Sequence, residues 1–221
     1  MTTQKTYTLT TTNKRRTLAE LSDEATSQPL YTLDLSFVTQ DMLPSKENKH
    51  SITMRAATTS PTTTTTPSDS SSPTPSSILG TCIFSLSSWA TPIHLCIGDP
   101  ISSPTTALWE DLRCRSQWET NAFELSLDSG DSSGRKLFVW KRTADIEGQG
   151  RVKAKLDWLH LKLVEGESGA VVAGFRHNFL YGRKRGVFWV EGEAGEEWVR
   201  VVLLSGVAVL EYLRKMSGWS W

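Results

Sequence analysis

The segment from Glu196 to Met216 constrains the fold most, because its pattern is that of a helix without a continuous polar stripe. Acidic Glu197 stands near its start and basic Arg214 near its end, as the helix dipole favours. The apolar residues between them are Trp198, Val199, Val201, Val202, Leu203, Leu204, Val207, Val209, Leu210 and Leu213. A helix that is apolar all round must be buried on every side. An antiparallel sheet that closes around this helix, about 31 Å long, provides such burial.

A membrane anchor is the alternative use of such a segment. Its longest uncharged run, residues 201–210, covers about 15 Å as a helix, roughly half of a bilayer's hydrocarbon core. We therefore expect a protein that is not transmembrane. Residues 1–12 lack the apolar stretch of a secretory signal, and three cysteines without a C-x-x-C pair indicate free thiols. We expect a cytoplasmic protein, with peripheral membrane contact left open.

Alternating apolar and polar residues dominate the rest of the chain. Residues 30–38 place Tyr31, Leu33, Leu35 and Phe37 on one face of a strand. Further short runs with the content of strands are 5–11, 51–57, 78–86, 93–98, 123–127, 136–142, 158–164, 170–176 and 186–191. Glycine-rich turn signals separate several of them. Many short strands at this spacing predict an antiparallel sandwich or barrel.

The run 158–164 also predicts which of its side chains are buried. Leu161 and Leu163 share one face, and His160 and Lys162 share the other. We therefore expect His160 on the polar face of its strand.

Residues 58–77 form a tract of Thr, Ser and Pro with a single acid, Asp69. Such a tract cannot bury enough apolar surface to offset the entropy of ordering, so we expect disorder. It is either a linker or a long loop inserted in a hairpin, and we favour the insertion because residues 1–57 are too few and too strand-poor to fold alone. We expect the first barrel strands in 1–57, the others in 78–195, a helix at 196–216 and a tail at 217–221.

The order of several short segments resembles a known family. These segments are Leu137-Phe-Val-Trp-Lys141, Leu161-Lys-Leu163, Val171-Val-Ala173 with Phe175, Arg183-Lys-Arg-Gly186 and Glu211-Tyr-Leu-Arg214. Together they resemble the fungal tubby-like domain family of unknown function. It belongs to the tubby C-terminal-like superfamily, with the LURP-one-related proteins and the phospholipid scramblases. The resemblance covers residues 78–213 best.

The resemblance implies a closed antiparallel barrel of twelve strands around a central C-terminal helix. The alternating runs account for ten strands, so two remain to be placed. Residues 108–115 and 152–156 are the expected positions. Because tubby proteins bind phosphoinositides through basic side chains, the resemblance also implies an anionic lipid as a ligand.

The sequence contains patterns that occur in catalytic or metal-binding sites, but the residues around them do not fit such sites. Gly130-Asp-Ser-Ser-Gly134 matches the G-x-S-x-G pattern of a hydrolase, but a strand instead of a helix is expected after Ser132. Cys82 and Cys96 become neighbours if their strands pair, and we expect them as small core residues. His50, His94, His160 and His177 share no ligand spacing. We expect no enzyme, no metal and no cofactor.

The charge pattern gives the functional hypotheses. Lys+Arg and Asp+Glu are both 24, which argues against nucleic acid as a partner. Residues 135–185 nevertheless carry an excess of seven positive charges, and four cations of this stretch cluster around one turn: Arg176, Arg183, Lys184 and Arg185. The first hypothesis is a monomeric barrel that binds anionic lipid headgroups with these residues. The alternative is a protein-interaction or scaffold barrel without lipid affinity.

The last residues of the chain leave two readings open. Trp219 and Trp221 are suited to a membrane interface, where indoles are favoured, and equally suited to closing one end of a barrel.

Overall fold

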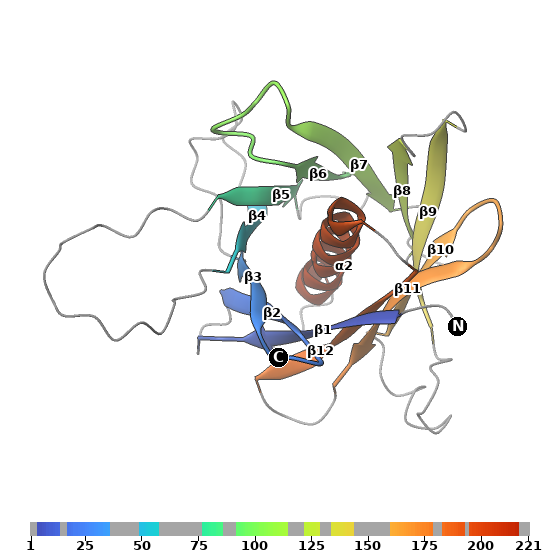
Figure 1. Cartoon of the computed structure of the whole chain (residues 1–221). Helices are drawn as coiled ribbons and strands as arrows, with labels where there is room; N and C mark the ends of the chain where they lie inside the picture. Colours follow the sequence, from blue (N-terminus) through green and yellow to red (C-terminus); the bar gives the residue numbers. More distant parts are fainter. Residues whose placement is uncertain are drawn as a thin grey trace, which may run out of the picture.

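A computed structural model shows a closed antiparallel barrel with one helix along its interior (Figure 1). It describes residues 4–13, 17–35, 49–57, 77–85, 92–114, 122–128, 134–143, 160–178, 183–192 and 195–216. The strands are β1 (Gln4–Thr11), β2 (Leu18–Asp23), β3 (Pro29–Asp34), β4 (Lys49–Ala56), β5 (Ile78–Ser85), β6 (Ile93–Ile97), β7 (Leu108–Cys114), β8 (Phe123–Asp128), β9 (Arg135–Arg142), β10 (Leu161–Glu165), β11 (Val171–His177) and β12 (Lys184–Glu191). The helix α2 spans Glu196–Met216. The expected fold class is confirmed.

Each strand pairs with the next one along the chain, and β12 closes the barrel by pairing with β1. All these pairings are antiparallel. In such a meander, connections that follow odd-numbered strands lie at one end of the barrel and those that follow even-numbered strands at the other. We call the first end the odd end and the second the even end. Because α2 follows β12, it starts at the even end and runs toward the odd end.

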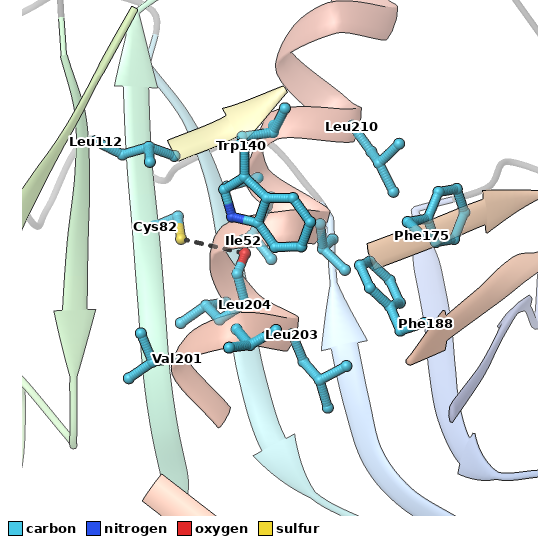
Figure 2. Close-up of a cluster of buried hydrophobic side chains, with 14 of the residues drawn as sticks. Ile52, Cys82, Leu112, Trp140, Phe175, Phe188, Val201, Leu203, Leu204 and Leu210 are labelled. Atoms are coloured by element: carbon cyan, nitrogen blue, oxygen red, sulfur yellow. Dashed lines mark hydrogen bonds between the residues drawn. The ribbon is translucent and has the colours of Figure 1, made fainter. Parts of the chain in front are cut away.

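The helix is the centre of the hydrophobic core. Every residue from Val201 to Leu213 is buried, including the polar Ser205 and Glu211. Figure 2 shows leucines and valines of α2 surrounded by side chains from several strands, among them Ile52, Cys82, Trp140, Phe175 and Phe188. The requirement that this segment be buried on all sides is therefore met by sheet closure.

A small residue brings the helix close to β5. A Cβ built on Gly80 would lie 2.7 Å from Leu204 Cδ2 and 2.8 Å from the backbone oxygen of Cys96. On the next inward position, Cys82 Sγ lies 3.9 Å from the carbonyl oxygen of Leu204, the dashed line in Figure 2. Glycine at this position lets the helix pack directly on the strand backbone.

Of the two strands that the alternating pattern did not assign, one lies at a predicted position and the other does not. β7 lies where residues 108–115 predicted it. The other is β2, which was not predicted, because only Ala19 and Leu21 face inward on it and Leu18 is exposed. The expectation for 152–156 lies outside the described residues, as does the tract at 58–76.

Burial of alternate residues follows the prediction closely, with one exception. Leu33 and Leu35 are buried, and so are Leu161 and Leu163, whereas Phe37 and the tail tryptophans lie outside the described residues. His160 was expected on a polar face and is fully buried instead. It precedes β10, at the odd end, where its Nδ1 accepts a hydrogen bond from the backbone N–H of His177 at 3.0 Å.

Candidate functional site

The four cations singled out in the sequence come together on the β11–β12 hairpin, at the odd end of the barrel. Arg176 is exposed on β11 and pairs with Val187 of β12. Arg183 and Lys184 are exposed at the start of β12. The turn residues between the strands, 179–182, lie outside the described residues. The hairpin thus presents three exposed cations on one edge of the barrel.

Arg185 points the other way because β12 carries a bulge. The register against β1 passes from Leu9↔Gly186 to Thr10↔Lys184, so Arg185 is an extra residue on β12. A bulge places two successive side chains on similar sides of the sheet and so re-aims one of them. Arg185 therefore shares the inner side with Gly186, and its side chain reaches the central helix.

Gly186 is required beside this bulge. A Cβ at this position would lie 2.4 Å from the backbone oxygen of Arg176 and 2.5 Å from the ring of Phe175. The absence of a side chain leaves the inner side of the bulge to Arg185 and to the ring of Phe175.

A buried ion cluster joins β12 to α2, and we call Arg185, Glu211 and Arg214 the inner cluster. Arg185 Nη1 donates to Glu211 Oε1 at 2.5 Å. Arg214 Nε and Nη2 donate to Glu211 Oε2 at 2.9 and 2.6 Å. The side chain of Glu211 is 4% exposed, against 15% for Arg185 and 19% for Arg214. One deeply buried carboxylate thus holds two guanidiniums near the boundary with solvent.

One donor of the inner cluster is unused. Arg185 Nη2 is buried and has no hydrogen-bond partner among the described residues. Such a buried donor costs roughly 1–3 kcal/mol. The three groups also carry a net positive charge, because two guanidiniums share one carboxylate.

Other partly buried cations lie at the same end. Burial lowers the pKa of Lys215, and the neighbouring charge of Arg214 lowers it further. Burial also lowers the pKa of Arg142, the last residue of β9, which lies at the odd end. Positive charge is therefore concentrated at this end both on the outer hairpin and around the helix terminus.

Cys82 and Cys96 are both buried in the β5–β6 pair, and Cys82 belongs to the core around α2. Cys82 pairs with Leu95 and Cys96 with Thr81, so the two thiols project to opposite faces of the β5–β6 pair. Burial raises the pKa of the Cys82 thiol well above its usual value and that of Cys96 to about 11. Neither thiol is therefore ionised near neutral pH. Within the part of the chain that the structure describes, no three metal-ligating side chains gather at one point.

The serine of the G-x-S-x-G pattern, Ser132, lies outside the described residues. The chain that follows it enters β9 at Arg135. A strand directly after the motif is the context expected of a hairpin rather than of a nucleophile elbow.

The sequence reasoning passed over a second surface on the β6–β7 hairpin. Ile101, Leu108 and Trp109 are large apolar residues there, and each is about half exposed. On the outer face of the same strands, Asp111 accepts from His94 Nδ1 at 2.9 Å and from Arg113 Nη2 at 3.0 Å. We call Ile101, Leu108 and Trp109 the apolar patch. The sequence alone does not show that Trp109 is exposed, because its exposure depends on where its strand lies in the barrel.

Known proteins offer no guide to the site. The chain matches no family model, no curated protein and no solved structure. Among the helices of the described residues, none is long and apolar enough to cross a membrane.

Proposed function

We propose that this barrel binds anionic lipid headgroups, phosphoinositides among them, at a membrane surface. The observation that carries the proposal is the gathering of exposed Arg176, Arg183 and Lys184 on one hairpin. A basic residue near an anionic membrane contributes about 1 kcal/mol, so three of them support weak, salt-sensitive peripheral binding. The resemblance to tubby-like proteins points to the same class of ligand.

A nearby acid does not cancel this charge. Lys184 Nζ lies 3.5 Å from Glu24 Oε1, and both side chains are more than a third exposed. An exposed ion pair of this kind is worth less than about 1 kcal/mol, so a headgroup can compete for the lysine. Arg185 is left out of the proposed surface because Glu211 already holds it inside the barrel.

Flotation of the purified protein with vesicles tests the proposal. Vesicles of phosphatidylcholine alone are compared with vesicles that also contain a phosphoinositide, at low and high salt. The variant with Arg176, Arg183 and Lys184 all changed to Gln should lose flotation with the anionic vesicles. High salt should weaken flotation of the unchanged protein. If the unchanged protein does not float at low salt, the proposal is wrong.

A charge-matched control separates this surface from net charge. The variant with Lys5, Arg113 and Lys136 changed to Gln removes the same number of cations from β1, β7 and β9. It should float like the unchanged protein. Equal loss in both variants would mean that the hairpin has no special part in binding.

The apolar patch favours a second candidate, a protein-interaction barrel. β6 and β12 are six steps apart in the ring of twelve strands and lie on opposite sides of α2 (Figure 1). The β6–β7 connection also lies at the even end, whereas the cations lie at the odd end. One flat membrane cannot contact both surfaces. Retained partner binding by the triple Gln variant, lost in Trp109→Ala, would support this second candidate.

A further inference from the structure

We infer that the inner cluster holds a binding site for a phosphate group, centred on the unused Nη2 of Arg185. The inference goes beyond the proposed function by naming the chemical group recognised, and it rests on that function only for a lipid source of the phosphate.

The bulge in β12 aims Arg185 at the central helix. Because of the extra residue in β12, the Arg185 side chain points toward the helix and not outward with Arg183 and Lys184. Arg214 donates only to Oε2 of Glu211, so Arg185 supplies the hydrogen bond to Oε1, and it does so with only one of its two terminal nitrogens. A second guanidinium adds positive charge at a place where burial makes it costly.

The pairing of Arg185 with Glu211 leaves one guanidinium donor without a partner among the described residues. Arg185 uses Nη1 for Glu211, while Nη2 has no acceptor among the described residues. Buried donors are almost always satisfied in native proteins, and an exception calls for a ligand, an ion or a water. The Arg185 side chain keeps 15% exposure although Nη2 itself is buried, so a ligand reaches this donor when the guanidinium turns toward solvent at the edge of the core.

The charges around Arg185 favour an anion as the ligand, and the donor geometry favours a phosphate. Arg183 and Lys184, directly before Arg185 in the chain, are exposed and concentrate anions at this end of the barrel. A phosphate monoester carries nearly two negative charges and three acceptor oxygens, so one oxygen can accept from Nη2 while the others stay hydrated. A guanidinium is also the side chain best matched to phosphate oxygens. A carboxylate offers one charge and two oxygens.

Thermal unfolding with inorganic phosphate as the probe tests the inference without a membrane. At concentrations too low for its general stabilising effect, phosphate should raise the unfolding temperature in a saturable way and more than sodium chloride of the same ionic strength, since a ligand of the folded state stabilises it. Equal shifts with the two salts would overturn the inference. This comparison uses the unchanged protein and does not depend on any variant folding.

Two variants then locate the site. Arg185→Lys keeps a cation for Glu211 but loses the second donor, and should need about tenfold more phosphate for the same shift. Lys5→Gln, which removes an exposed cation of β1 away from the site, is the control and should stay within about twofold of the unchanged protein. If Arg185→Lys responds like the unchanged protein, the site is elsewhere and the inference fails.

Vesicles distinguish the source of the phosphate. Phosphatidic acid carries a phosphate monoester, whereas phosphatidylserine carries a diester and a carboxylate. If Arg185 recognises lipid phosphate, Arg185→Lys should lose more flotation with phosphatidic acid than with phosphatidylserine. Phosphate binding without any flotation would support the inference for a soluble phosphate and reject the proposed lipid function. Equal flotation losses with the two lipids, together with no specific phosphate effect, would reject the site.

Discussion

The indole Nε1–H of Trp140 donates a hydrogen bond to Ser205 Oγ at 3.0 Å, inside the barrel. Both residues are fully buried, and the Ser205 hydroxyl donates in turn to the carbonyl oxygen of Val202 at 3.1 Å. This chain of two bonds joins β9 to the middle of the helix. It provides hydrogen-bond partners for polar groups that would otherwise have none in an apolar core.

Ser205→Ala should destabilise the protein by about 1–3 kcal/mol, because the indole donor of Trp140 is left buried without an acceptor. Urea denaturation measures the free energy of unfolding. Ser103→Ala, at an exposed position, is the control and should change it by less than about 0.5 kcal/mol. Equal effects of the two substitutions would contradict the buried bond.

Two glutamates of α2 that pair with arginines should differ widely in their contribution to the free energy of unfolding. Glu211→Gln removes the charge that holds Arg185 and Arg214, and breaking such a buried pair costs about 3–5 kcal/mol. Glu196→Gln breaks the pair with Arg200, in which the Glu196 side chain is 83% exposed, and should cost less than about 0.5 kcal/mol. Denaturation of both variants in parallel measures the difference. Similar losses would mean that Glu211 is not buried as described.

Stability should fall in alkali between about pH 10 and pH 12. Burial raises the pKa of Tyr7 from its usual value of 10 to about 12, and the charges of Asp23 and Glu196 add to this effect. A pKa raised in the folded state gives stability that is fully present below pH 10 and is lost as the pH rises through 12. Tyr7→Phe should therefore reduce the slope of unfolding free energy against pH in this window. The same slope in the variant would assign the effect to other buried groups.

Gly186→Ala should destabilise the protein by several kcal/mol, because its Cβ would overlap the backbone of Arg176 and the ring of Phe175. At Gly195, by contrast, a Cβ meets nothing within 4 Å. Gly195→Ala should therefore change the unfolding free energy by about 1 kcal/mol or less. Equal losses would contradict the close packing beside the bulge.

The sequence predicts the helix with its observed bounds because its charges mark both ends and its apolar surface has no break. It also predicts most strands, since alternation is strong wherever large apolar residues face inward, as at Leu33 and Leu163. β2 escapes this reasoning because Ala19 is small and Leu18 faces solvent. The signal of a strand depends on the size of its inward residues as well as on their spacing.

The candidate site depends on contacts that the local sequence pattern does not predict. Arg183, Lys184 and Arg185 form one basic run in the sequence, and nothing local distinguishes them. The bulge that separates Arg185 from its neighbours arises from the pairing of β12 with β1, the last and first strands of the barrel. Nothing local in the sequence indicates that Glu211 pairs with Arg185, because this contact joins the helix to the sheet.

The most direct test of this account compares three single substitutions in that basic run. Arg183→Gln, Lys184→Gln and Arg185→Gln each remove one positive charge from consecutive positions. The account predicts that only Arg185→Gln lowers the unfolding temperature substantially, by roughly 6–12 °C for a loss of about 3 kcal/mol, because only this residue is paired with buried Glu211. Equal and small shifts in all three variants would contradict an inward Arg185 and the inner cluster built on it.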